Sequence, residues 1–327
     1  MAESTLTLEY NDFASATAAF LGYGRKGWES VADQVEQIDS YIQSGYRNFI
    51  NAAPLDGVLQ THEWSFMRPV TTITTIASYS TGTVTIVDGV VTLASGTFPS
   101  FGTARGELKL TETGASYAVS TRDSSTQLTL TDTTLDADAL SEYELSFPTY
   151  DLPDDWGSFI GDLTYPPGTS DFYPPVPIVG EGMLRAKRQM AVWTGRPTLA
   201  AHRPKTFVAT TGQRFELLFD PSPDSAYTLT YKYNANPNRL TATNKYHLGG
   251  MRHSECVLES ILAVAEARVN DNAGIHAMKF KELLAASIAF DKTQGSPDYL
   301  GLNIDRSDGV VLDPHRYPVS LVTYDPV

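Results

Sequence analysis

The sequence has almost no cysteine, no long apolar run and a deficit of basic residues. Its one cysteine, Cys256, excludes a disulfide within the chain and a zinc site built from cysteines, and we expect it to be a small buried helix residue. No run approaches the roughly 18 apolar residues of a membrane-spanning helix, and the start of the chain lacks the basic and apolar regions of a secretory signal. The sequence therefore predicts neither a membrane span nor a signal peptide.

The deficit of basic residues limits how tightly the chain can bind nucleic acid. The 24 Lys and Arg residues are outnumbered by 38 Asp and Glu residues, which gives a net charge of −14. Tight binding of DNA needs a basic surface that displaces counterions, so we expect none here. An acidic wall repels phosphates, and the composition therefore remains compatible with a channel through which double-stranded DNA passes without tight binding.

Motifs of catalysis are also missing. The chain contains no HExxH, no GxSxG and no P-loop, which argues against a zinc protease, an α/β-hydrolase and a packaging motor. One GxGxxG match, residues 22–27, follows a helix-like segment and precedes no βαβ unit, so we expect a loop between helices and no dinucleotide site. The six histidines are scattered along the chain. We therefore predict no catalytic, cofactor or metal site, and a protein that is not an enzyme.

Apolar residues at spacings of three and four predict helices near both ends of the chain. The helical stretches are residues 10–21, residues 28–51 and residues 251–293, the last interrupted by a turn at residues 270–274. Each of them is amphipathic, and a single helix cannot bury its apolar stripe alone. The N- and C-terminal helices are therefore expected to form one bundle.

Between these helices the chain becomes rich in Thr, Ser, Val and Gly. Two alternating runs meet at Asp88-Gly89, a strong signal for a β-hairpin with a type I′ turn. Short strands at this spacing are typical of a small antiparallel barrel or sandwich, and an inserted module should have its ends close together. Further elements are expected in this stretch and around it, namely strands at residues 60–68, 107–110, 116–120, 127–131, 143–147, 198–202, 206–210, 214–219 and 227–233 and a short helix at residues 182–191.

These patterns together predict an α+β fold. We expect N-terminal bundle helices in residues 1–70, an inserted antiparallel β module in residues 71–147, and a Pro-rich loop with a β meander in residues 148–248. A C-terminal helical hairpin in residues 249–293 completes the bundle, and residues 294–327 form an extended arm.

The arm is too apolar for simple disorder, and we expect it to dock on a partner. Its candidate docking residues are Tyr299, Leu300, Val310, Val311, Leu312, Tyr317, Val319, Leu321 and Tyr324.

The order of several motifs resembles that of the head-to-tail adaptor (connector, or tail tubular A-like) proteins of tailed bacteriophages. The helix VADQVEQIDSYIQSGYRNFIN is followed by EWSF at residues 63–66, YDLPDDW at residues 150–156 and TGRP at residues 194–197. FELLFDPSPDSAYTLTYKYNANPNRL and the helix ESILAVAEARVND then complete the series. The W-x-F, Y-x-LP-x-D and P-x-P-D-x-x-Y-T-L elements contribute most to this resemblance. The resemblance covers nearly the whole chain apart from the inserted module, which itself resembles small β modules of phage tail and neck proteins.

The resemblance implies a structural, non-enzymatic role. Members of the family form a ring, typically of twelve subunits, beneath the portal protein, with a C-terminal arm inserted into the portal and the opposite face against the tail or a nozzle protein. It places the protein in the virion neck after assembly in the host cytoplasm, lining the channel through which DNA leaves.

Two other roles stay open at the level of the sequence. One is a glycan-binding or glycan-cleaving tail component, in which aromatic residues would stack on a sugar and paired carboxylates would act on it. The other is a different neck, terminator or baseplate protein of the tail. The residues that the glycan alternative would use are Trp156, Tyr165 and Tyr173 beside Asp154 and Asp155, with Asp162, Asp171 and Glu63 as further carboxylates.

Overall fold

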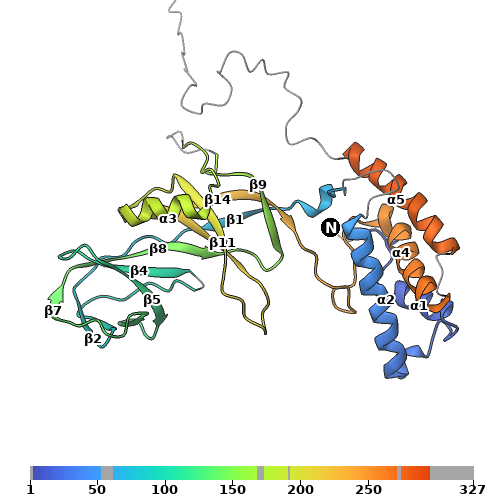
Figure 1. Ribbon diagram of the computed structural model, residues 1–327, viewed down its shortest axis with the longest axis horizontal. Helices are drawn as coiled ribbons and strands as arrows, with labels where there is room; N and C mark the ends of the chain where they lie inside the picture. The colour runs from blue at the N-terminus through green and yellow to red at the C-terminus, as the bar shows by residue number, and fades with distance from the viewer. Residues whose placement is uncertain are drawn as a thin grey trace, which may run out of the picture. The chain divides into compact units, whose positions relative to one another are not determined.

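The chain divides into a helical unit and a β unit. Among the described residues, the helical unit combines those before Val70 with those from Ala235 to Gln294, and the β unit is formed by the residues between them. The structure is a computed structural model that describes residues 3–52, 62–102, 104–167, 173–190, 192–270 and 274–294. Figure 1 shows the N-terminal helices in blue beside the C-terminal helices in orange, so the two ends of the sequence build one unit.

Helices form at all three stretches that the apolar spacing predicts. Their bounds are α1 (Tyr10–Phe20), the 3₁₀ turn η1 (Trp28–Ser30), α2 (Ala32–Asn51), the 3₁₀ turn η2 (Ser65–Met67), α4 (Met251–Asn270) and α5 (Ile275–Gln294). The strand expected over residues 60–68 is wrong, because η2 occupies its described part. Trp64 is buried there and its indole N–H donates to the carbonyl of Ile50 at the end of α2, which fixes a turn in place of an extended chain.

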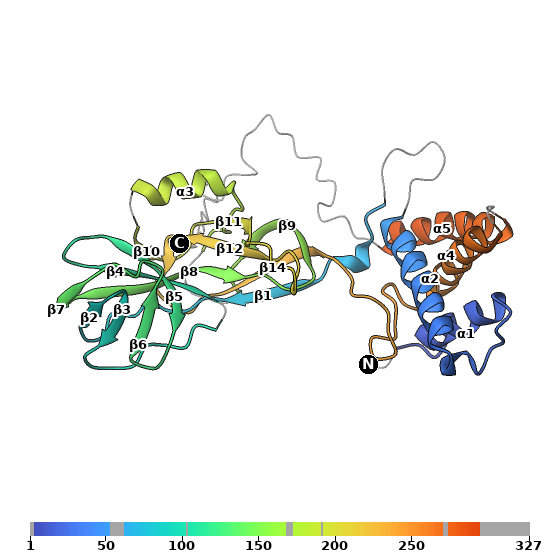
Figure 2. The same cartoon turned by 60° about the horizontal axis from the view of Figure 1, so that its bottom comes forward.

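Helix α4 is the centre of the helical unit. It lies between α2 and α5 (Figure 2), and both neighbours pack on it. The contact with α2 is close at Gly45, whose carbonyl accepts a hydrogen bond of 2.7 Å from the Ser260 hydroxyl. The buried residues of this core come from every helix of the unit, and the largest contributions are Phe13, Trp28, Ile38, Ile42, Phe49, Trp64, Val257, Ile261 and Leu284.

The β unit is built on a nine-stranded sheet, in the order β11-β12-β8-β4-β5-β6-β3-β2-β7. The strand pairings described for it are antiparallel. Its strands are β2 (Val84–Val87), β3 (Val90–Leu93), β4 (Arg105–Leu110), β5 (Ser116–Arg122), β6 (Gln127–Leu130), β7 (Ala137–Ser141), β8 (Tyr143–Asp151), β11 (Leu199–Pro204) and β12 (Phe215–Asp220).

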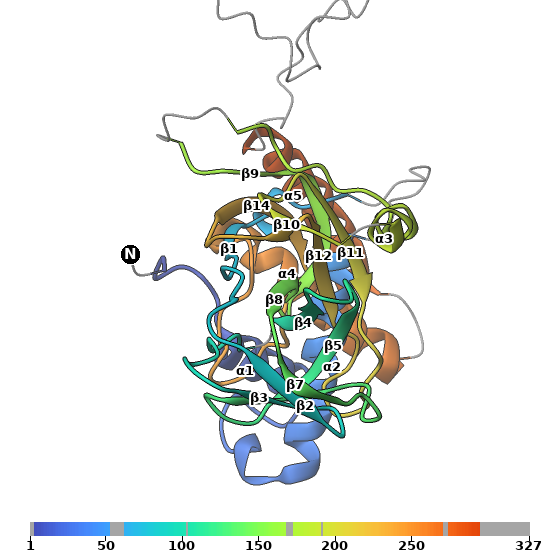
Figure 3. The same ribbon diagram turned by 90° about the vertical axis from the view of Figure 1, so that its left-hand side faces the viewer.

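Smaller elements complete the unit. They are a sheet of β1 (Val70–Thr74), β14 (Thr228–Ala235) and β9 (Trp156–Thr164), a short parallel pair of β10 (Thr194–Gly195) and β13 (Ser222–Pro223), and helix α3 (Glu181–Met190), which lies beside β11 (Figure 3). The mixed α+β class predicted from the sequence is therefore confirmed. Among the described helices, none is long and apolar enough to cross a membrane.

The observed strand pairings agree only in part with those expected from the sequence. The hairpin at Asp88-Gly89 is confirmed, with φ of 49° and 73° at its two central residues. Tyr79 and Leu145 exchange two backbone hydrogen bonds of 2.8 Å, so residues 79 and 145 lie side by side, whereas residues 70–74 pair with β14 in a different sheet. Strand β8 then continues past residue 147, where the sequence predicts the boundary between the two β segments, and pairs with β12.

The strand expected at residues 206–210 is wrong. Strand β11 ends at Pro204, and the chain turns back at once, with the carbonyl of Val208 accepting hydrogen bonds from the amides of Thr211 and Gly212. The alternating residues of this stretch therefore belong to the tip of the β11–β12 hairpin. Gly212 has a φ of 74°, which the tight turn requires and which glycine adopts without strain.

Candidate docking surfaces

The arm residues proposed for docking lie outside the described residues. These are Tyr299, Leu300, Val310, Val311, Leu312, Tyr317, Val319, Leu321 and Tyr324. The described chain ends at Gln294, the last residue of α5. Their role in docking therefore stays a prediction.

The structure separates the aromatic residues of the glycan alternative. The ring of Trp156 is 4% exposed and packs against Phe159, His202 and Phe215 at centroid distances of 5.2, 5.2 and 4.8 Å. A ring enclosed in this way has no free face for a sugar. Asp155, next to it, accepts a hydrogen bond of 3.0 Å from the Tyr233 hydroxyl. Trp156 is therefore a core residue of the β unit.

Tyr165 and Tyr173, by contrast, are brought together. Their ring centroids are 5.2 Å apart, the Arg196 guanidinium lies 4.2 Å from the centroid of Tyr173, and the Tyr165 hydroxyl donates to the carbonyl of Pro197. Burial raises the pKa of Tyr165. These contacts tie the loop after β9 to the TGRP motif, and they account for both rings as packing residues.

The candidate carboxylates are held by structural partners or lie apart. Asp154 forms an ion pair with Arg214, and Glu63 forms one of 2.6 Å with Arg68. Asp162 is exposed on β9, and Asp171 lies outside the described residues. Within the described ranges, no group of three or more His, Cys, Asp and Glu residues could hold a metal ion.

Two other sequence features are explained by the helical unit. The GxGxxG match connects α1 to η1, so it is the expected loop between helices. Cys256 lies on α4 and is 2% exposed, as expected, and burial raises the pKa of its thiol to about 12. Such a thiol stays protonated at neutral pH and is unreactive.

A buried polar cluster joins η2 to α5, and nothing in the sequence pattern pointed to it. Asp291 is 4% exposed, and its Oδ1 atom accepts a hydrogen bond of 2.5 Å from the Ser65 hydroxyl. Its Oδ2 atom accepts one of 3.0 Å from the Ser65 amide and lies 2.7 Å from His62 Nε2. Burial alone would raise the pKa of Asp291, but the hydrogen bonds from Ser65 and His62 outweigh it and lower this pKa. The cluster fixes the end of α5 from which residues 295–327 continue.

His253 lies beside this cluster within a shell of aromatic rings. It is 2% exposed, and the rings of Phe49, Trp64, Phe66 and Phe290 have centroids 5.3 to 6.0 Å from its own. Its Nδ1 atom has no hydrogen-bond partner in the described part of the chain. Burial lowers the pKa of His253, aided by the nearby His62 and His247 and opposed by Asp291.

Acid is expected to destabilise the helical unit. Burial lowers the pKa of both His247 and His253 below the ordinary value of 6.5, so at lower pH the unfolded chain binds more protons than the folded one. The contribution of these two histidines to the free energy of unfolding should be fully present above a pH of about 6.5. It should decline as the pH falls below that value, by at most about 1.4 kcal/mol per pH unit for each histidine. Thermal unfolding followed by circular dichroism between about pH 7.5 and about pH 5.5 measures this decline.

The variant His253→Phe is the control for this pH dependence. It removes one of the two buried histidines and keeps a ring in the aromatic shell, so its melting temperature should fall less steeply with acid. A melting temperature of the natural chain that does not change over this range would contradict the expected effect.

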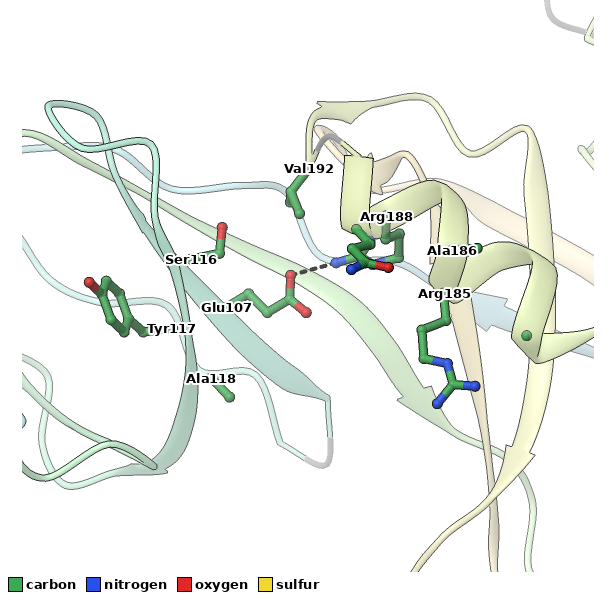
Figure 4. A pocket seen from close by; sticks show the side chains of 10 residues that line it. Glu107, Ser116, Tyr117, Ala118, Arg185, Ala186, Arg188 and Val192 are labelled. Atoms are coloured by element: carbon green, nitrogen blue, oxygen red, sulfur yellow. Dashed lines mark hydrogen bonds and ion pairs between the residues drawn. The ribbon is translucent and has the colours of Figure 1, made fainter.

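A groove lies between α3 and strands β4 and β5 (Figure 4). It has a volume of about 680 Å³. Its floor is the ion pair of Arg188 with Glu107 at 2.5 Å, and Arg188 also donates to the Phe219 carbonyl and the Ser222 hydroxyl. Its walls are formed by small β5 residues and by one face of α3, including Ser116, Ala118, Gly182, Arg185, Ala186 and Gln189. The ion pair fixes α3 on the sheet and so shapes the groove.

Removal of the Arg188 side chain is expected to destabilise the β unit. Only 9% of this side chain is exposed, and its loss leaves Glu107 and two buried acceptors without their donor. We expect Arg188→Ala to lower the free energy of unfolding by about 2–3 kcal/mol. Arg185→Ala is the matched control, because this side chain is 75% exposed and lies 3.7 Å from Glu181, and it should cost less than about 0.5 kcal/mol. Urea unfolding of both variants measures the difference, and equal effects would contradict it.

A family model described as SU10 adaptor protein matches residues 111–301, more than half of the chain. The chain belongs to the SU10 adaptor protein family. It is a family of phage head-tail adaptors, so the resemblance drawn from the motifs is confirmed. The match includes α3, the β11–β12 hairpin and both C-terminal helices of the adaptor. A comparison with curated proteins finds no match.

Membership in the family assigns the adaptor a coarse role. It is a structural phage protein that associates with other virion components and is located in the virion.

Proposed function

We propose that the adaptor forms a closed ring of twelve subunits between the portal protein and the tail or a nozzle protein. The observation that carries the proposal is the family match over residues 111–301. Double-stranded DNA would pass through the ring, and the net charge of −14 supports a channel wall that repels phosphates. Assembly would take place in the host cytoplasm.

The apolar arm supports the part of this proposal in which the adaptor binds the portal protein. Residues 294–327 carry a high proportion of Val, Leu and Tyr, which in water need a partner surface. The helical unit, which ends where the arm begins, would present the arm to the portal. Tail terminator and baseplate proteins share such features, so position along the virion is the property that separates them from this assignment.

Electron microscopy tests the proposal in two ways. Mixed with its portal, the adaptor should form rings whose class averages have twelvefold symmetry, and an antibody to the adaptor should label the neck of the virion. A protein that stays monomeric and never binds portal would overturn the ring, and label at the distal end of the tail would overturn the location.

A further inference from the structure

Strand β1 is an uncovered edge of the three-stranded sheet. It pairs with β14 on one side, and no other described strand pairs with its outer side (Figure 2). The edges of β9 and β11, by contrast, are covered by residues 176–179. Val176 exchanges backbone hydrogen bonds of 2.8 and 3.0 Å with Leu163 of β9, and the Val179 amide donates to the Ala200 carbonyl of β11 at 2.8 Å. The β unit therefore covers sheet edges with segments of its own chain.

The backbone groups of Thr72 and Thr74 point away from β14. The amide of Thr75 donates to the Tyr227 carbonyl of the neighbouring strand at 2.8 Å, so the backbone of Thr75 faces β14. In an antiparallel pair, successive residues direct their amides and carbonyls to the partner strand and to the open side in turn, so Thr72 and Thr74 face outward. Outside the pairing of β1 with β14, the described chain offers these groups no hydrogen-bond partner.

Nothing in the sequence of β1 discourages the addition of a further strand. Natural edge strands are usually protected by a charged side chain, a proline or a bulge. The strand Val70–Thr74, VTTIT, has no charged residue, no proline and a regular register with β14. Val70 is 64% exposed, and Thr72 and Thr74 are exposed as well. Such an edge fits an extended, uncharged segment that pairs with it through the backbone.

Residues 319–324 of the arm have the composition of such a segment. Their sequence, VSLVTY, is rich in β-branched residues and carries no charge. Pro318 and Pro326 lie on either side of it, and a proline is accepted at the end of a strand but not in its middle. The six residues of this run also match the five of β1 in length.

The arm and β1 leave the helical unit from the same point. Asp291 near the end of α5 holds Ser65 through hydrogen bonds of 2.5 and 3.0 Å. Val70 follows Ser65 after five residues, which span at most about 18 Å, and α5 ends three residues after Asp291. Residues 295–318 span up to about 80 Å when extended, so residues 319–324 can reach β1 of their own chain.

We propose that residues 319–324 pair with β1 of the same chain and form a fourth strand of its sheet in the free subunit. Tethering favours the chain's own segment over that of a second copy, because a short flexible connection gives an effective concentration in the millimolar range. The added strand satisfies the outward backbone groups of Thr72 and Thr74 and closes an edge that would otherwise be open to aggregation. The inference does not rest on the proposed role of the arm at the portal. If the arm also docks there, the strand must first leave β1.

Disulfide trapping in the full chain without portal tests this pairing. Thr72→Cys is combined in turn with a cysteine at each position from 319 to 324. Across a hydrogen-bonded strand pair the Cα atoms are about 5.5 Å apart, a separation that a disulfide spans. Because side chains of a strand alternate between its two faces, one set of alternate positions, either 319, 321 and 323 or 320, 322 and 324, should give at least about fivefold more disulfide within one chain than the other set.

Thr92→Cys is the matched control for the trapping. Thr92 is an exposed threonine of β3, an interior strand of the nine-stranded sheet, and it should form a disulfide with none of the six positions. Cys256 does not interfere, because it is buried. Disulfides that join two chains would assign the edge to a second copy and overturn the proposal. Equal yields at all six positions, or no disulfide at any of them, would overturn it as well.

Hydrogen exchange measures the same contact without added cysteines. Thr72→Pro removes one outward amide of β1 and keeps the amides that face β14, and a proline is tolerated where the amide of an edge strand faces outward. The amides of residues 319–324 should be protected in the natural chain and exchange at least about tenfold faster in Thr72→Pro. Ser307→Pro, a proline in the arm outside this run, should leave their protection unchanged. Amides of residues 319–324 that exchange in the natural chain as fast as in an unfolded peptide would overturn the proposal.

Discussion

Replacement of Gly45 by leucine is expected to unfold the helical unit. A β-carbon at this position would lie 2.4 Å from the Cα atom and 2.7 Å from the amide nitrogen of Ile261, so α2 and α4 touch through their backbones here. No change of side-chain rotamer relieves that clash, and the helices must separate, which breaks the hydrogen bond from Ser260 to the Gly45 carbonyl. A cost above about 4 kcal/mol is a large part of the roughly 5–15 kcal/mol that stabilises a domain.

Circular dichroism and thermal unfolding measure this effect. Asn48→Leu is the matched control, because Asn48 is exposed on the same helix and the change should alter stability by less than about 0.5 kcal/mol. Gly45→Ala should fall between the two. If Gly45→Leu melts within about 2 °C of the natural chain, the close contact of α2 with α4 is wrong.

Deletion of residues 296–327 is expected to abolish docking on the portal. The deleted stretch contains the apolar residues proposed to insert into the portal, whereas the core of the helical unit is built from described residues up to α5. Binding would therefore be lost while the helical content and the melting temperature of the remaining chain stay close to their natural values. Co-sedimentation with purified portal measures the loss.

A point variant separates the arm's contacts from its length. Leu321→Asp keeps every residue of the chain and introduces a charge in the apolar run at residues 319–324, so it should weaken portal binding by at least about tenfold, the equivalent of about 1.4 kcal/mol. Ser307→Asp introduces the same charge outside the apolar runs and should bind normally. Docking that survives the deletion would show that the arm is assigned wrongly.

The elements of the fold were predictable where one local pattern dominates. The helices at both ends follow from apolar spacing, and the hairpin at Asp88-Gly89 follows from a turn that needs positive φ at both positions. The sheet order was not predictable, because it depends on pairs such as Leu217 with Tyr150, which are far apart in the sequence. The wrong strand at residues 60–68 has the same cause, since the burial of Trp64 against the end of α2 is a tertiary contact.

The candidate sites were predictable to a smaller extent. The sequence showed an apolar C-terminal stretch and the absence of the common catalytic motifs. It could not show that Trp156 is enclosed by three other rings. The bond between His62 and Asp291 joins residues 229 positions apart, and the groove beside α3 depends on how a helix lies on a sheet. Such features arise only when distant parts of the chain are brought together.

The assembly of one unit from both ends of the chain has a consequence for protein synthesis. The described residues of the β unit form one stretch, Val70–Asn234, which can fold while the ribosome is still translating the rest of the chain. Helix α2 is synthesised early, but its partner α4 ends only at Asn270. The apolar stripe of α2 therefore stays without this partner for roughly 10–40 s at usual elongation rates. During that interval the nascent chain is exposed to aggregation, and a truncated product that stops before α4 should be a substrate for chaperones and proteases of the host.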